Sequence, residues 1–99
     1  MHALALDGAG APVGTARMQV DGHIGRMAVL TPWRRQGVGR ALLAYLIQLA
    51  ARQGLGLVWL TAQIGAVGFY TRAGFVVEGE PFTEAGILHR TLTRRLAGD

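Results

Sequence analysis

A short segment rich in arginine and glycine, with the letters PWRRQGVGR, is the part of the sequence whose residue types and spacing most clearly indicate chemistry. It directly precedes a stretch with helical periodicity. Gly37 and Gly39 remove side chains where that helix begins, so the amide hydrogens of its first turn can face a ligand at close range. A helix N-terminus carries partial positive charge, and Arg34, Arg35 and Arg40 add full charges around it. The pattern therefore favours binding of a phosphate.

Other interpretations of this segment are a tight strand-to-helix turn with solvated arginines, a dinucleotide fingerprint or a nucleic-acid patch. The dinucleotide fingerprint is disfavoured because Leu42 stands at its third glycine position and the expected acidic partner on a following strand is missing. A nucleic-acid patch is also disfavoured, because the arginines crowd one turn and lack the interleaved aromatic residues of a base-stacking surface. A bound phosphate and a simple turn both stay open at this point.

Composition excludes several classes of protein. The chain has 99 residues and a mass of 10.5 kDa, so we expect one domain spanning residues 1–99. With 51% hydrophobic and 16% charged residues it is not a disordered segment. It has no cysteine, which excludes disulfide scaffolds and cysteine nucleophiles, and all ten basic residues are arginine, which excludes lysine phosphate loops and Schiff bases. The net charge of +4 favours an anionic partner.

The sequence gives no sign of secretion, membrane insertion or metal binding. The first ten residues lack the pattern of a signal peptide, and the longest apolar run, residues 41–47, is too short to cross a bilayer. We therefore expect a cytoplasmic protein with no membrane contact. No histidine pair has metal-ligand spacing, so we predict no metal and interpret His2 and His23 as structural.

Hydrophobic periodicity predicts the elements that must position these residues. Alternating apolar and polar residues flank Asp21-Gly22, a strong hairpin signal, and apolar residues at helical spacing run from Val38 towards Gly54. We expect strands at 2–6, 13–20 and 23–30, a helix from 38, a strand at 55–62, a helix at 66–73, and strands at 75–77 and 87–93. This order predicts an α+β fold with an α/β-type mixed sheet.

Two motifs in the same order and at the same separation resemble the GNAT superfamily of N-acetyltransferases. The pattern R-x-x-G-x-G is matched by Arg34, Gly37 and Gly39, and A-x-x-F-Y-x-x-x-G-F is matched by residues 66–75. Residues 79–89 and Thr61-Ala62-Gln63 resemble the ElaA-like branch, which carries G-E-x-F-x-E-x-G-I-x-H after the second helix. The resemblance covers roughly residues 13–93 and implies a GNAT-like acyl-CoA N-acyltransferase fold.

The resemblance implies acetyl-CoA as the acyl donor, bound in a cleft where two parallel strands splay apart. Pantetheine would pair with one strand like an extra strand, and the pyrophosphate would accept hydrogen bonds from the amides of the glycine turn. Gln63 is either a ligand contact or only a polar residue that closes a strand. The cofactor-binding residues so implied are Met27, Ala28, Val29, Arg34, Arg35, Gln36, Gly37, Val38, Gly39, Arg40 and Gln63.

The resemblance also implies the catalytic groups. Tyr70 would be the general acid that protonates the departing CoA thiolate, although a core aromatic beside Phe69 is the competing interpretation. Glu80, Glu84 and His89 are candidates for the base or for acceptor contacts, or else surface charges and a strand histidine. The expected reaction is direct transfer to a primary amine in a ternary complex, and the absence of a cysteine that could carry the acetyl group agrees with this mechanism. The alternatives are a CoA-binding or regulatory module without turnover and, less favoured, a basic nucleic-acid-binding domain.

The sequence departs from the family pattern at its N-terminus, where the usual strand and helices do not precede the first hairpin. We therefore expect an N-terminally shortened fold with an uncovered sheet edge. An uncovered edge favours pairing with another subunit, so we expect a homodimer or higher oligomer. The acceptor amine is not specified by the sequence.

Overall fold

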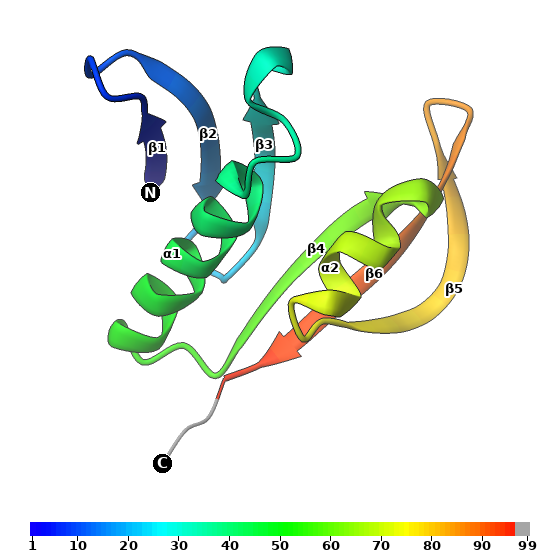
Figure 1. The fold of residues 1–99 in the computed structure, drawn as a ribbon. Helices are drawn as coiled ribbons and strands as arrows, with labels where there is room; N and C mark the ends of the chain where they lie inside the picture. Colours follow the sequence, from blue (N-terminus) through cyan, green and yellow to red (C-terminus); the bar gives the residue numbers. More distant parts are fainter. Residues whose placement is uncertain (97–99) are drawn as a thin grey trace.

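The chain folds into two three-stranded sheets and two helices, as a computed structural model of residues 1–96 shows (Figure 1). Residues 97–99 of the expected domain lie outside the described part. The elements are β1 His2–Leu6, β2 Pro12–Met18, β3 Ile24–Val29, α1 Val38–Arg52, β4 Leu57–Gln63, α2 Val67–Arg72, β5 Val76–Glu84 and β6 Ile87–Arg95, with 3₁₀ turns at Thr31–Trp33 and Ile64–Ala66. The sheet orders are β1-β2-β3 and β4-β6-β5, and every strand pair within a sheet is antiparallel. The α+β class is confirmed.

The two sheets meet through one parallel bridge between His23 and Trp59. The Trp59 amide donates a hydrogen bond to the Gly22 carbonyl over 3.0 Å, and the His23 ring stacks on the Trp59 ring with centroids 4.1 Å apart. From this junction β3 and β4 diverge (Figure 1). The mixed character predicted from the sequence is therefore one parallel contact between two antiparallel sheets.

Helix α1 packs on the first sheet with the apolar face that its sequence periodicity predicts. Leu46 and Ala50 are fully buried, and Gly14 of β2 permits the close approach, since a Cβ there would lie 2.9 Å from Val38 Cγ1. Helix α2 lies over the second sheet, where Leu92 is also fully buried. One connected cluster contains the buried residues Ala3, Ala16, Met18, Ile24, Leu42, Leu43, Leu46, Ala50, Val58, Leu60, Ala62, Phe75 and Leu92.

Some element boundaries differ from those predicted. The strand expected at 75–77 runs over Val76–Glu84, because a break in register between Glu78 and Phe82 accommodates polar residues that interrupt the apolar pattern. The Arg90 guanidinium stabilises this break by donating to the Gly79 carbonyl over 2.8 Å. Most residues of β5 are exposed, and many of them are polar, which explains why the sequence of this strand resembles that of a loop. Among residues 1–96, no helix combines the length and the apolar character that a membrane crossing requires.

Gly22 makes the junction of the two sheets possible, and its replacement gives a direct test. Its φ is +90°, and a Cβ would lie 2.6 Å from the Leu57 carbonyl oxygen. We expect Gly22→Ala to lower the free energy of unfolding by about 1–3 kcal/mol more than Gly10→Ala. Gly10 is the matched control, because its φ is +86° but nothing lies within 4 Å of an added Cβ. Equal losses in urea unfolding of the two variants would contradict the role of this contact.

Candidate functional site

A cleft of about 320 Å³ lies between the diverging strands β3 and β4. Within residues 1–96, each of these strands pairs with one neighbour in its own sheet, so beyond the His23–Trp59 bridge their other edges face the cleft. Unpaired strand edges offer backbone donors and acceptors to an extended ligand. The cleft is lined by Ile24, Gly25, Arg26, Met27, Leu60, Thr61, Ala62, Gln63, Ala66, Tyr70 and His89.

A bulge in β3 shapes one wall of the cleft. Thr15 pairs with Ala28 and Arg17 pairs with Gly25, so two residues of β3 stand opposite one of β2. Arg26, at the bulge, has a φ of +52°, in the left-handed region that non-glycine residues rarely adopt. Such backbone costs on the order of 1 kcal/mol or more and concentrates at functional sites. The bulge bends β3 and places Arg26 at the cleft.

Tyr70 of α2 is both a packing residue and a lining residue of the cleft. Its ring makes edge-to-face contacts with Phe69 and Phe75, with centroids 5.0 and 6.0 Å away, so it belongs to the packing of α2. It also lines the cleft. Burial raises the pKa of the Tyr70 hydroxyl, because the charged phenolate would lose solvation. The hydroxyl therefore keeps its proton at neutral pH, as a general acid must.

Gln63 and His89 lie side by side on β4 and β6, where they are register partners, and both line the cleft. The His89 Nδ1 is 2.8 Å from the Ile87 carbonyl oxygen. A carbonyl oxygen can only accept, so Nδ1 carries the hydrogen in this bond, and Nε2 of a neutral ring is left with its lone pair. The ring also stacks on Phe82, with centroids 5.8 Å apart. His89 is thus a fixed imidazole with a free acceptor nitrogen.

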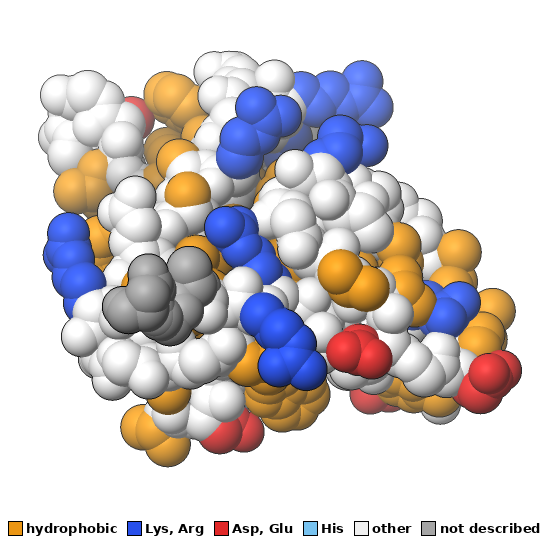
Figure 2. Space-filling model, turned by 90° about the horizontal axis from the view of Figure 1, so that it is seen from below, with side chains coloured by type: hydrophobic (Ala, Val, Ile, Leu, Met, Phe, Trp, Pro, Cys, Tyr) orange, Lys and Arg blue, Asp and Glu red, His pale blue; other side chains and the backbone are white. Residues whose placement is uncertain are grey.

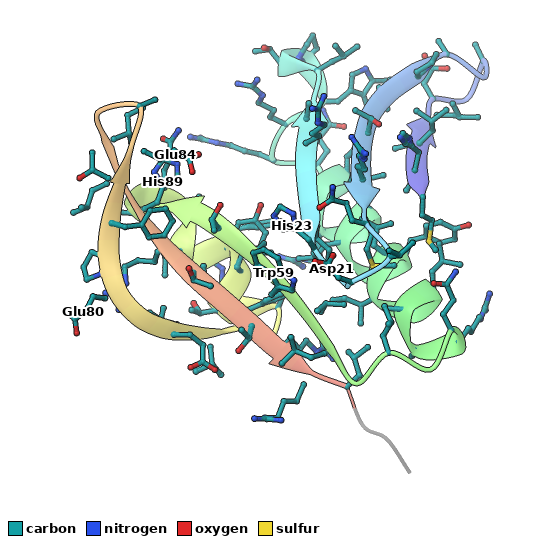
Figure 3. All side chains as sticks on the ribbon, turned by 180° about the vertical axis from the view of Figure 1, so that it is seen from behind. Asp21, His23, Trp59, Glu80, Glu84 and His89 are labelled. Atoms are coloured by element: carbon teal, nitrogen blue, oxygen red, sulfur yellow. The ribbon has the colours of Figure 1, made fainter. Side chains whose placement is uncertain are left out.

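The three candidates for the base do not all come together. Figure 3 shows Glu84 beside His89 near the β5–β6 turn, whereas Glu80 lies at the outer side of β5 and points away. Both carboxylates are exposed. Glu84 pairs with Ile87, two residues before His89 on β6, whereas the curvature of β5 carries Glu80 away from the cleft. Of the three candidates, His89 lines the cleft.

The arginine- and glycine-rich turn leads into α1 beside the cleft. Gly37 caps the helix with a φ of +84°, and Gly39 lies close to Phe69 and Met27, since an added Cβ would be 3.5 Å from Phe69 Cζ and 3.9 Å from Met27 Sδ. Arg34 Nε donates to the Val29 carbonyl over 3.0 Å. The same turn contains Arg35 and Gln36 and leads into Val38, the first residue of α1. The side-chain amide of Gln36 donates a hydrogen bond to the Pro32 carbonyl over 3.0 Å. Arg34 and Gln36 thus hold the turn in place through these bonds.

A groove of about 450 Å³ extends this region between the two helices. It is lined by Arg40, Phe69, Arg72 and Ala73. Arg72 is a cationic residue that the sequence analysis missed, although it stands inside the second motif, in FYTRAGF. Arg40 and Arg72 together make the helix-start side of the cleft strongly basic.

The largest hollow of the first sheet is a separate apolar groove of about 550 Å³. Ala28 and Val29 line this groove and not the cleft, so of the three residues expected along pantetheine only Met27 lines the cleft itself. Leu4 and Leu30 also line it and are exposed. Among the described residues that line this groove, Arg34 alone is charged.

The two diverging strands, with the glycine-rich helix start beside them, form the arrangement that the resemblance to the GNAT superfamily implies. A comparison with known families agrees: the family model described as acetyltransferase (GNAT) domain matches residues 1–96, and the chain belongs to this family. The fold class and the resemblance read from the two motifs are thereby confirmed.

Individual relatives support the same assignment. The chain is 33% identical to the uncharacterized protein YyaT of Bacillus subtilis over 89 residues, which cover 87% of this chain and 60% of YyaT. It is 36% identical to the uncharacterized N-acetyltransferase YjcF of the same organism over 92 residues, covering 89% of this chain and 65% of YjcF. The chain thus spans about 60% of the length of YyaT.

Solved structures share the fold. An acyl-CoA N-acyltransferase from Pseudomonas aeruginosa superposes with a TM-score of 0.81 at 31% identity, covering 94% of this chain and 66% of that chain. Escherichia coli ElaA gives a TM-score of 0.81 at 27% identity, again with 94% of this chain and 66% of that chain covered. The similarity to ElaA agrees with the branch that residues 79–89 resemble.

The raised pKa of Tyr70 predicts a pH dependence of stability. Folding favours the protonated phenol, and this preference adds to the free energy of unfolding. The added stability is complete below pH 10.0, the ordinary pKa of tyrosine, and is lost as the pH rises through the higher pKa that Tyr70 has in the folded state. We expect the free energy of unfolding to fall above pH 10 in the wild type, and to fall less in Tyr70→Phe. Urea unfolding between pH 8 and pH 11 measures this, with Tyr45→Phe as the control because Tyr45 is 49% exposed. Parallel curves for wild type and Tyr70→Phe would contradict it.

Proposed function

We propose that this chain transfers an acetyl group from acetyl-CoA to a primary amine, directly, in a ternary complex. The observation that carries the proposal is the cleft between two open strand edges, lined by Tyr70 and His89 and adjoining the glycine-led start of α1. Family membership supports acyl transfer in general. Acetyl-CoA, the amine and the ternary mechanism go beyond that and are the content of the proposal.

The donor is held by three parts of the chain in this proposal. The open edge of β3 offers its backbone to the amides of pantetheine as a neighbouring strand would, beside Met27, which lines the cleft. The first-turn amides of α1 and the side chains of Arg35 and Arg40 bind the pyrophosphate. Arg72, beside Arg40 in the helix groove, supplies a further cation for the phosphates.

Proton transfers in this proposal use the two groups that line the cleft. The amine nitrogen forms a bond to the thioester carbonyl carbon, and the carbon–sulfur bond breaks. His89 Nε2 takes the proton that the amine loses, and the Tyr70 hydroxyl gives its proton to the departing sulfur. Glu84, which pairs with Ile87 two residues before His89, adds negative charge on this side and so favours the imidazolium in this proposal. Gln63 lines the cleft from β4 and contacts the acyl donor in this proposal.

Two further expectations stay predictions. The exposed residues Leu4, Leu6 and Leu30 support the homo-oligomer expected from the sequence, since monomers rarely expose such surfaces in one region. The cytoplasmic location likewise stays a prediction.

A nucleic-acid-binding role is not supported by the surface in Figure 2, where arginine side chains lie in several separate groups and not in one continuous strip.

Binding of acetyl-CoA tests the role of the helix start. We expect Gly39→Val to weaken binding by about tenfold or more, because the valine methyl groups occupy the space between the first turn of α1, Phe69 and Met27. Isothermal titration calorimetry of both proteins gives the two dissociation constants. Gly56→Val is the matched control, since nothing lies within 4 Å of an added Cβ at Gly56. A folded Gly39→Val protein that binds like the wild type would overturn this placement of the phosphates.

The role of Tyr70 separates catalysis from binding. We expect Tyr70→Phe to lower kcat by about 100-fold, the size of a general-acid contribution, while the dissociation constant of acetyl-CoA stays close to that of the wild type. The rate of turnover is measured as the release of free CoA thiol, with a panel of amines as acceptors. Wild-type protein that binds acetyl-CoA but acetylates no amine would favour the binding-module alternative over the enzyme.

A further inference from the structure

A second, basic hollow adjoins the cleft on the β2–β3 hairpin. Its volume is about 210 Å³, and it shares Gly25 and Arg26 with the cleft. We call it the arginine pocket, and its lining residues are Arg17, Gln19, His23, Gly25 and Arg26. Because two lining residues are common to both hollows, one ligand can occupy both of them.

The two guanidinium groups of the arginine pocket are available to a ligand. Arg17 stands on β2 opposite Gly25, where the absence of a side chain leaves open space, since nothing lies within 4 Å of an added Cβ. Among residues 1–96, the guanidinium groups that donate hydrogen bonds to the protein are those of Arg34, Arg90 and Arg94. The donors of Arg17 and Arg26 are therefore free for an anion.

The remaining walls are polar and held in place. The His23 ring is fixed between its stack on Trp59 and a 2.8 Å contact from Nδ1 to the Gln19 side-chain oxygen. No acidic residue lines the pocket among the described residues. The nearest carboxylate along the chain, Asp21, accepts a hydrogen bond from the His23 amide over 3.1 Å and so caps the turn. The left-handed backbone at Arg26 holds that residue at the border with the cleft.

We propose that the arginine pocket binds the anionic group of the acceptor, so that the acceptor is an amine that also carries a carboxylate or a phosphate. This inference rests on the proposed function. The donor approaches from the α1 side, where Gly39 lies against Met27 and Phe69, so the acceptor must enter the cleft from another side. A guanidinium pair recognises carboxylate and phosphate oxygens through paired hydrogen bonds. An amine without an anionic group would leave both cations unpaired.

Matched pairs of acceptors test this selectivity. L-phenylalanine is compared with 2-phenylethylamine, and O-phosphoethanolamine with ethanolamine, with acetyl-CoA as donor. We expect kcat/KM to be about tenfold or more higher for the anionic member of at least one pair, as a hydrogen-bonded charge is worth about that factor. The pair that shows the preference distinguishes a carboxylate from a phosphate.

Variants link the preference to the pocket. Arg17→Gln should reduce the anionic-to-neutral ratio of kcat/KM about tenfold, and Arg26→Gln should do the same if Arg17→Gln fails to fold. Comparing ratios between variant and wild type cancels the intrinsic reactivities of the amines. Arg52→Gln is the matched control, because Arg52 is an exposed arginine at the end of α1. A preference that Arg17→Gln and Arg26→Gln leave intact would overturn the proposal.

A binding measurement keeps this test independent of turnover. N-acetyl-L-phenylalanine is titrated into the protein beside the neutral N-acetyl-2-phenylethylamine. Binding of the anionic compound alone, weakened in Arg17→Gln but not in Arg52→Gln, supports the pocket even if no acetylation is detected and the proposed function fails. Active enzyme that treats both members of every pair alike within twofold overturns the pocket and leaves the acetyltransferase in place.

Discussion

The single parallel contact between His23 and Trp59 is the constraint on which the rest of the structure depends. One backbone hydrogen bond and one stacked ring pair hold the two sheets together at this point. Had the parallel pairing continued, β3 and β4 would have satisfied each other's backbone groups and closed the sheet. Because this pairing stops after one bridge within residues 1–96, both strands keep an open edge, and the cleft lies between these edges. The His23–Trp59 bridge thus joins the two sheets, and the divergence of β3 and β4 beyond it opens the cleft.

The parts of the site that depend on local sequence could be predicted, and the structure shows why. Helix α1 and its glycine-led start follow from apolar spacing and from the conformational freedom of Gly37, both properties of adjacent residues. Tyr70 was predicted from a motif within one short helix, and it lines the cleft. The order of strands was correct because each strand, apart from β5, has its own apolar pattern. Local rules therefore gave the elements and one side of the cleft.

The remaining features depend on contacts between distant parts of the chain. The length of β5 was wrong, since its polar residues are tolerated only through pairing with β6 and the bond from Arg90 to Gly79. The left-handed conformation of Arg26 was not predictable, because a bulge depends on the register of β2 against β3. The arginine pocket follows from that same register, which sets Arg17 opposite Gly25. His23, interpreted as structural, is both a structural junction residue and a wall of that pocket.

Charge is arranged around the cleft in a way that composition alone could not show. A chain with no lysine relies on guanidinium groups, which form paired hydrogen bonds with oxyanions and do not lose their charge at neutral pH. One set, Arg40 and Arg72, lies at the helix-start side, and the other, Arg17 and Arg26, lies on the β2–β3 hairpin. The two sets line different hollows, which share no lining residue. Two separate sets of cations favour two anionic groups on two molecules that are bound at the same time, which agrees with the proposed direct transfer.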